Sequence, residues 1–207
     1  MPGGASRSLE ITTQKGLLRK TSGEDIIGIT VCFSQRYPDA ERAADGLIAK
    51  LKMSPTGIGG YLSPGPGGGA TILDAALPER FQGDRKDYSI NYFPLKAGDV
   101  LKMHTLNQEE QWFFHEGSAI ALHLFGPNGY ERVIVGADLD QGQVMQAVAP
   151  GQQWFGAELV GPGYALVSCS LAPGWDKRDS ALPSPAQVSA LLAANPVQAS
   201  LIGTLTR

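Results

Sequence analysis

The chain has 207 residues, enough for one domain with a sizeable core and marginal for two. Its formal net charge of −3 provides neither a basic surface for nucleic acid nor a polybasic patch for a membrane, so the sequence predicts neither partner. The 26 glycines and 14 prolines favour turns and short strands over a helical bundle.

The two cysteines form neither a metal motif nor a redox motif. Cys32 and Cys169 each lie in an apolar run, which indicates buried free thiols; a disulfide between them is the alternative, without a secretory context to support it. The N-terminus lacks a basic region followed by an apolar segment, and no apolar run is long enough to cross a bilayer. We therefore expect a cytoplasmic protein.

The first part of the chain is expected to be an extension of the domain. Residues 1–40 predict a partly ordered arm plus a short strand at 26–33. Residues 38–53 carry apolar side chains at helical spacing and predict a helix, and residues 54–70 predict a loop rich in glycine and proline.

From residue 88 onward the pattern changes to short strands in which apolar and polar residues alternate. About eight antiparallel strands at this spacing predict a sandwich or a barrel, which removes exposed edges. Residues 183–207 then predict two short helices broken at Pro196. The predicted strands are 89–95, 100–105, 111–115, 119–125, 132–135, 143–148, 153–158 and 165–171, with turns at 96–99, 116–117, 126–129 and 161–163.

One stretch of the predicted barrel has the most informative spacing in the chain. It begins at Gly98 and ends at Gly117, with His104, Leu106 and Glu110 between them. A strand that ends in a histidine is followed by a polar corner and an aromatic strand. This order is typical of a β-hairpin that brings a histidine and a glutamate to one place.

The spacing resembles the first motif of the cupin superfamily, in which a small β-barrel carries two histidines, a glutamate and a glycine. Residues 147–159 are similar to the second motif of that superfamily. Gly151 is in place there, and Trp154 stands where the motif has a histidine.

The chain also resembles one subfamily in particular, the cupin-5 type domain of unknown function. The likeness covers about residues 42–207, while Ile58 replaces a usual glutamate and Phe113 stands where many members have a histidine. The segments that carry the likeness are 55–61, His104, Glu110, Trp112, His115, 153–159 and 165–175.

The resemblance implies a mainly β fold, the double-stranded β-helix of cupins (an RmlC-like jelly-roll barrel), with an N-terminal helix and short C-terminal helices. Residues 41–207 would form this single domain, and the protein would be a homodimer with a pocket for a small molecule. Cupins include storage proteins, isomerases, oxygenases and binding modules, so the fold does not fix the function.

A metal site is the first chemistry to weigh. Mononuclear iron, manganese or zinc needs three or four converging His and carboxylate ligands. His104 and Glu110 stand at matching places, but Leu106 and Trp154 occupy the other two. His115 would be a third ligand only if it faced inward, and strand alternation places it opposite Glu110. The sequence therefore predicts no metal cofactor, with Fe, Mn or Zn as the alternative.

A metal-free His104 and Glu110 pair is the catalytic candidate. Together these groups can move a proton to or from a carbon next to a carbonyl, as in isomerases and epimerases, or they can only bind a ligand. The expected ligand-binding residues, which include the aromatic pocket walls and further polar groups, are Tyr61, Tyr92, Lys102, Trp112, Phe114, Trp154 and Glu158.

These residues leave three functions open. The first is a metal-independent small-molecule-binding cupin, with isomerase or epimerase activity on a sugar-like or other polar ligand as an option. The second is a metal-dependent cupin enzyme such as a dioxygenase. The third is a non-catalytic structural or storage-type cupin.

Overall fold

The computed structural model describes residues 12–13, 16–17, 38–63 and 65–207. The chain divides into two units, Met1–Gln35 and Arg36–Arg207. In the first unit, β1 (Thr12–Thr13) pairs antiparallel with β2 (Gly16–Leu17). The predicted strand at 26–33, with Cys32, lies outside the described residues.

The second unit begins with helix α1 (Pro38–Lys50), as the apolar spacing predicts. The helix ends earlier than predicted because Lys52 adopts a left-handed conformation, with φ of 52°. The amide of Lys52 donates to the carbonyl of Ala49 at 3.2 Å, and that of Met53 donates to Ile48 at 2.9 Å. These two bonds form a Schellman motif, which satisfies the last carbonyls of the helix.

Two short strand pairs occupy the region between α1 and the barrel. Part of it was predicted as loop, but the structure has β3 (Ser54–Pro55) paired with β4 (Tyr61–Leu62). Further along, β5 (Thr71–Ile72) pairs with β6 (Arg85–Lys86), and the 3-10 helix η1 (Asp74–Ala76) lies between them.

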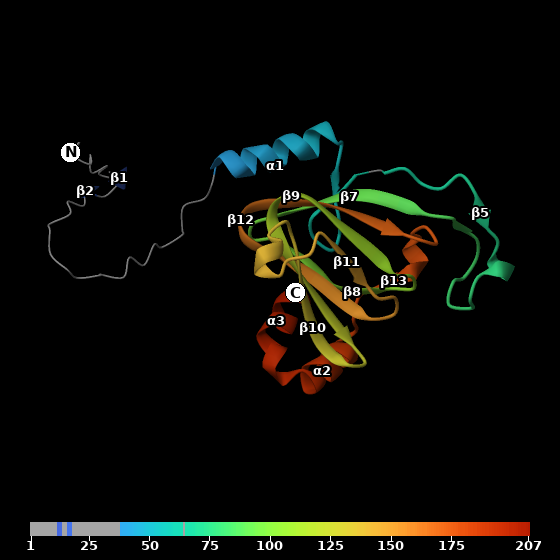
Figure 1. Ribbon diagram of the computed structural model, residues 1–207. Helices are drawn as coiled ribbons and strands as arrows, with labels where there is room; N and C mark the ends of the chain where they lie inside the picture. The colour runs from blue at the N-terminus through green and yellow to red at the C-terminus, as the bar shows by residue number, and fades with distance from the viewer. Residues whose placement is uncertain (1–11, 14–15, 18–37, 64) are drawn as a thin grey trace. The chain divides into compact units, whose positions relative to one another are not determined.

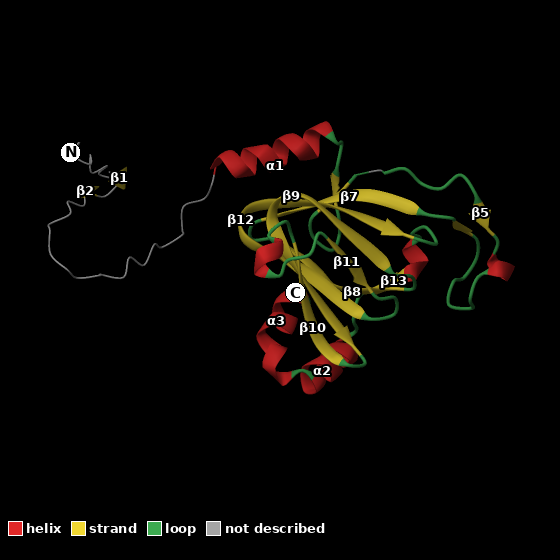
Figure 2. Ribbon diagram, in the orientation of Figure 1, coloured by secondary structure: helices red, strands yellow, loops and turns green. Residues whose placement is uncertain are grey.

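The remaining strands form one seven-stranded antiparallel sheet (Figures 1 and 2). The main path runs β10, β9, β12, β8, β13, while β11 pairs with β9 and β7 pairs with β12. The members are β7 (Ser89–Lys96), β8 (Val100–Leu106), β9 (Glu110–Gly126), β10 (Gly129–Val135), β11 (Gln146–Ala149), β12 (Trp154–Leu171) and β13 (Ser180–Ala181).

Two predicted turns are wrong, because the chain bends there without reversing. Residues 116–117 lie inside β9 and residues 161–163 lie inside β12. Gly117 has a φ of +93°, and the pairing of β9 with β12 shifts register between Val160 and Ala165. A bulge of this kind curves a strand and lets it serve two sides of a barrel. The four short strands predicted here are therefore two long ones.

The C-terminal helices cover the outer face of the sheet. They are α2 (Pro185–Ala194), the 3-10 turn η4 (Pro196–Gln198) and α3 (Ala199–Leu205). A capping box of Ser184 and Gln187 starts α2. The outer core cluster, which these helices form with the sheet, contains Met103, Phe125, Leu191, Ile202 and Leu205.

No single helix among residues 38–63 and 65–207 is long and apolar enough to cross a membrane. Pro185–Ala194 and Pro196–Leu205 reach that length and composition only together, and the pair is bent by 116°.

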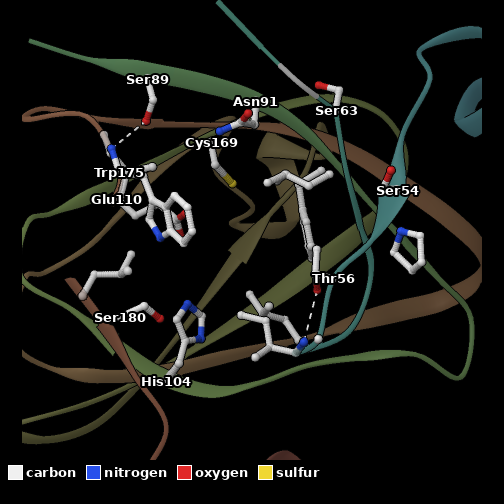
Figure 3. A pocket seen from close by; sticks show the side chains of 18 of the residues that line it. Ser54, Thr56, Ser63, Ser89, Asn91, His104, Glu110, Cys169, Trp175 and Ser180 are labelled. Carbon is white, nitrogen blue, oxygen red and sulfur yellow. Dashed lines mark hydrogen bonds between the residues drawn. The ribbon is translucent and has the colours of Figure 1, made fainter. Parts of the chain in front are cut away.

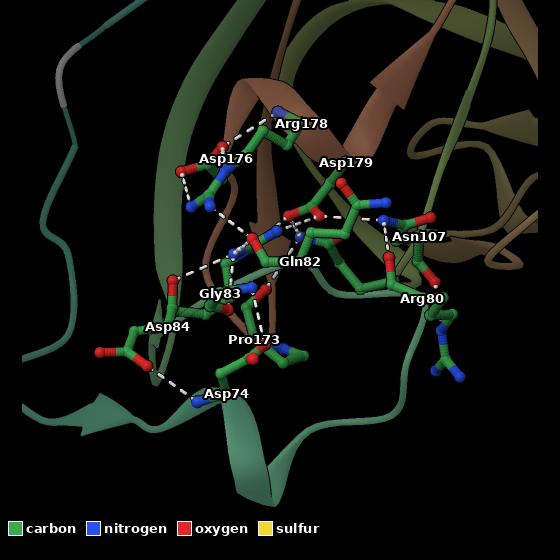
Figure 4. Close-up of polar contacts among 12 residues, drawn as sticks. Asp74, Arg80, Gln82, Gly83, Asp84, Asn107, Pro173, Asp176, Arg178 and Asp179 are labelled. Atoms are coloured by element: carbon green, nitrogen blue, oxygen red, sulfur yellow. Dashed lines mark hydrogen bonds and ion pairs between the residues drawn. The ribbon is translucent and has the colours of Figure 1, made fainter.

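A buried ion pair fixes the loops at one end of the barrel (Figure 4). Arg85 donates from Nε and Nη2 to the two carboxylate oxygens of Asp179, at 2.8 and 2.7 Å. The side chains are 1% and 0% exposed. Asn107 and Gln108 donate to the same carboxylate at 3.0 and 3.4 Å. We call these four residues the Asp179 cluster; it joins β6, the β8–β9 turn and the 3-10 helix η3 (Lys177–Asp179).

Candidate functional site

A cavity of about 760 Å³ lies against the inner strands of the barrel. Its wall comes from the β3–β4 hairpin, from β7, β8, β9 and β12, and from the segment that holds Trp175 and Ser180. Figure 3 shows side chains from these segments turned toward a common space. Asp179 directly precedes Ser180 in the sequence, so the Asp179 cluster helps to position Ser180 on this wall.

His104, on β8, supplies a hydrogen-bond acceptor to the cavity (Figure 3). Its Nδ1 lies 2.9 Å from the carbonyl oxygen of Lys102. Because a carbonyl can only accept, we assign the proton to Nδ1, which leaves Nε2 as an acceptor. Burial lowers the pKa of His104 to about 4, against the opposing effect of the Lys102 bond, so the ring is neutral at pH 7.

Glu110, the first residue of β9, supplies a carboxyl group to the same cavity. Its Oε2 accepts a bond of 2.9 Å from Nε1 of Trp112, two residues along the same strand face. The thiol of Cys169 also hydrogen-bonds to it. Burial raises the pKa of Glu110 to about 7, although the bonds from Trp112 and Cys169 lower it. Both protonation states are therefore populated near neutral pH.

The rest of the wall is largely apolar, with hydroxyl and amide groups added. Among the lining residues that the structure describes, Lys52 is the only lysine or arginine. The larger apolar side chains are Ile58, Leu62, Phe93, Leu101, Leu106, Trp112, Leu171 and Trp175. The neutral polar groups are Ser54, Thr56, Ser63, Ser89, Asn91, Cys169 and Ser180.

The β3–β4 hairpin is a fixed part of this wall. The carbonyl of Ile58, at its tip, accepts a bond of 2.7 Å from the amide of Lys102. Gly59 has a φ of +100°, and a Cβ there would overlap the carbonyl oxygen of Val100. Gly59 thus allows a close approach of the hairpin to β8, and the adjacent Gly60 allows one to Phe93 and Pro94 of β7.

A bulge in β8 explains why Lys102 is absent from the cavity lining. Phe155 pairs with His104 and Ala157 pairs with Leu101, so β8 has one more residue than β12 between these pairs. Both Leu101 and His104 therefore line the cavity. Alternation from His104 predicted Lys102 on the cavity side, and that placement is corrected.

Trp154 and Glu158 lie on the outer face of β12, which corrects their predicted positions. The ring of Phe155 packs against His104 with centroids 4.2 Å apart, so Phe155 is the inward residue and its neighbour Trp154 points outward. Trp154 packs on the outer core cluster. Glu158 has the same parity, and its Oε1 lies 3.4 Å from Nε2 of His123.

Three further predicted ligand-binding residues, one of them the predicted wall residue Phe114, also lie outside the cavity lining. Phe114 packs against the inner core cluster, whose members include Leu95, Trp112 and Val167. Tyr61 lies under the ammonium group of Lys96, 5.3 Å from the ring centroid. Tyr92 meets the ring of His115 edge-on, at 5.5 Å. Of the predicted site residues, the structure brings His104, Glu110 and Trp112 together.

The ligands for a mononuclear metal do not come together. His115, the possible third ligand, lies 2.8 Å from the hydroxyl of Ser168 and outside the cavity lining. Within the described part of the chain, no group of three or more His, Cys, Asp or Glu residues is arranged to hold a metal ion. Since Leu106 lines the cavity where a further ligand would stand, the residues present do not fit a resident metal.

Several cavity residues were missed by sequence reasoning. Cys169 shares one face of a predicted strand with the apolar residues Val167 and Leu171. This pattern could have predicted that its thiol faces inward, where the structure places it beside Glu110. Trp175 and Ser180 follow the last long strand, and only the tertiary fold brings them to the cavity.

A barrel of this topology, with a cavity lined by the histidine of one strand and the glutamate of the next, defines a cupin. The Cupin_5 family, described as cupin superfamily (DUF985), matches residues 45–183. The chain belongs to this family, which confirms the resemblance and the fold class drawn from the sequence.

Solved structures of two other proteins are similar to this chain over most of its length. A hypothetical protein from Leishmania major is 27% identical, with a TM-score of 0.67, over 79% of this chain and 98% of that chain. A protein from Shewanella oneidensis is 29% identical, with a TM-score of 0.68, over 79% and 97%. Oxalate decarboxylase from Bacillus subtilis is 14% identical, with a TM-score of 0.44, over 73% and 36%, a likeness too distant to inform function. A search of curated proteins found no match.

Proposed function

We propose that this cupin binds a small molecule in the barrel cavity without a metal ion, with His104 and Glu110 as the polar centre. The observation that carries the proposal is their placement on one cavity of about 760 Å³, a volume in the usual range for small-molecule sites. Each side chain is oriented by a bond to the protein, His104 by Lys102 and Glu110 by Trp112. Oriented polar groups on an apolar wall are what a specific binding site requires.

The protonation states favour binding over two-group acid–base catalysis. His104 is a weak base with a pKa of about 4, and its one proton is used in the bond to Lys102. It can accept a hydrogen bond but is a poor proton donor at neutral pH. The pair therefore suits recognition of a ligand better than the exchange of protons on two faces of a substrate.

Proton transfer by Glu110 alone is the second candidate function. A pKa of about 7 is well matched to a general base at neutral pH. The carboxylate would take a proton from a carbon next to a carbonyl and return it to another position, as a single-base isomerase does. Incorporation of deuterium from D₂O into the bound ligand, lost in Glu110→Gln, would distinguish this activity from binding.

The further proposals come from the sequence and from the family resemblance. A metal-dependent enzyme such as a dioxygenase and a structural or storage-type cupin are the alternatives; near-stoichiometric iron, manganese or zinc, lost in His104→Ala, would favour the former. The protein is proposed to be a cytoplasmic homodimer, which light scattering of the purified chain tests for oligomeric state.

Native mass spectrometry tests the binding proposal directly. We expect a retained small molecule in the purified protein, at lower occupancy in His104→Phe and Ile58→Trp, because one variant removes an acceptor and the other fills the cavity. His115→Phe is the matched control, since this histidine lies outside the cavity lining. Equal occupancy in all variants would place the ligand elsewhere and contradict the proposal.

A further inference from the structure

We infer that the cavity selects an uncharged ligand, with an apolar body and a hydroxyl group for His104, and rejects a ligand that brings a carboxylate or phosphate to the polar centre. This inference rests on the proposed binding function and names the chemical class of ligand. It departs from the sequence-based expectation of a sugar-like or other polar ligand.

The acceptor on His104 defines the group that a ligand must present. Because Nδ1 donates to the carbonyl of Lys102, Nε2 has a lone pair and no proton. A ligand hydroxyl can donate to this atom, whereas a carboxylate or a phosphate dianion has no proton to give. The side chain is 4% exposed and packed on Phe155, so its orientation is fixed.

No cation among the described lining residues stands ready to bind an anion at the polar centre. Lys52 is the one lysine or arginine among them, and it is exposed beyond the end of α1. Arg85 belongs to the Asp179 cluster, where both of its outer nitrogens are engaged, with Asp179 and with backbone carbonyls. Recognition of carboxylate or phosphate ordinarily uses such a guanidinium or ammonium group.

Glu110 supplies no counter-charge to an anion in either of its protonation states. As a carboxylate it repels a second negative charge within the same cavity. As a carboxylic acid it offers one hydrogen bond but no counter-charge, and the surrounding wall is apolar. Among the described lining residues, ionised Glu110 is the one counter-charge for a cation. Burial of such an ion pair is also costly, because both charges lose their hydration on a largely apolar wall.

Three probes of one shape test the inference: 2-naphthalenemethanol, 2-naphthoate and 2-naphthalenemethylamine, which are neutral, anionic and cationic at pH 7. Isothermal titration calorimetry should give a dissociation constant for the alcohol at least about tenfold below that of either charged probe, since burying an ion on an apolar wall is costly. His104→Phe should weaken binding of the alcohol, and His115→Phe should leave it unchanged.

A gain-of-function variant keeps the test independent of folding defects. Ile58 is partly exposed on the hairpin, so Ile58→Lys places a cation on the wall and should tighten binding of 2-naphthoate, whereas Ile58→Met should not. Binding of 2-naphthoate or the amine as tight as that of the alcohol would overturn the inference and leave the proposed function standing. Failure of all three probes, and of the smaller set benzyl alcohol, benzoate and benzylamine, would count against the proposed function itself.

Discussion

Asp179 and Glu110 are buried carboxylates of the same domain, but their partners differ in charge. Burial alone would raise the pKa of Asp179, but hydrogen bonds from Arg85 and Asn107 outweigh this effect and hold it below the usual value. Burial raises the pKa of Glu110 to about 7, and its donors among the described residues are the neutral groups of Trp112 and Cys169. The carboxylate of Asp179 is held in its charged form, and that of Glu110 is near the midpoint of its titration at neutral pH.

The difference shows how the fold separates structure from function. In the Asp179 cluster, protein groups fully engage the carboxylate, and the result is a fixed junction of β6, the β8–β9 turn and η3 (Figure 4). Glu110 faces a cavity that holds the acceptor of His104 as well. A polar group that is oriented but incompletely paired is able to bind a ligand, whereas a fully paired one stabilises the fold.

Replacement of each carboxylate by its amide should give the largest expected difference in the free energy of unfolding between the two sites. Asp179→Asn leaves Arg85 buried without its counter-charge, so we expect the free energy of unfolding to fall by about 3–5 kcal/mol. Glu110→Gln leaves no buried cation without its counter-charge, so we expect the free energy of unfolding to change by at most about 1 kcal/mol. Urea unfolding followed by tryptophan fluorescence measures both.

A double variant provides the control for this comparison. Arg85→Met with Asp179→Leu removes both charges and should recover much of the loss, as replacement of a buried ion pair by apolar residues often does. Similar losses for Asp179→Asn and Glu110→Gln would show that the two carboxylates do not differ as described.

The pH dependence of stability should separate Glu110 from His104. A pKa raised from 4.5 to about 7 means that Glu110 stabilises the fold fully below about pH 4.5, and that this contribution is lost as pH rises to 7. A pKa lowered from 6.5 to about 4 means that the contribution of His104 is present above pH 6.5 and lost as pH falls to 4. The two effects oppose each other, each amounting to at most about 3 kcal/mol.

In the wild type the opposing effects of Glu110 and His104 on the pH dependence of stability partly cancel, so each should become measurable when the other residue is replaced. Between pH 4.5 and 6.5, Glu110→Gln should gain stability more steeply with rising pH than the wild type, and His104→Phe should lose it. Unfolding midpoints measured across this window check both signs. Parallel profiles for the wild type and both variants would contradict the shifted pKa values.

Trp112→Phe should lower the free energy of unfolding by about 1 kcal/mol, because it removes one hydrogen bond to Glu110 and keeps most of the packing. In the wild type this bond stabilises the ionised form of Glu110, so its loss should raise the pKa of Glu110 further. A titration of the carboxyl carbon by ¹³C NMR measures this rise. Trp154→Phe, on the outer face of β12 and outside the cavity lining, is the control that should leave the titration unchanged.

The fold and the centre of the site could be predicted from local patterns, and the periphery could not. His104, Glu110 and Trp112 follow from motif spacing and alternation along two neighbouring strands. Lys102 was placed on the wrong face because a bulge in β8 reverses the alternation of side chains. Trp154 was placed on the wrong face because its neighbour Phe155 is the inward residue, and a shift of one residue reverses the face.

Contacts between residues far apart in the sequence could not be predicted, for a different reason. Arg85 and Asp179 are separated by 94 positions, and neither residue carries a local pattern that identifies the other. Trp175 and Ser180 likewise reach the cavity through the path of the chain after β12. Pairings of this kind depend on the complete fold.

The histidine side chains offer the most direct test of the central claim, that His104 presents a fixed neutral acceptor to a ligand cavity. The chain has three histidines, so a long-range ¹H–¹⁵N spectrum can be assigned with His104→Phe and His115→Phe. We predict that His104 keeps its proton on Nδ1 from pH 5 to 8, and that 2-naphthalenemethanol shifts its Nε2 resonance while those of His115 and His123 stay in place. Titration of His104 near pH 6.5, or a ligand response at His115 or His123 instead, would contradict the account.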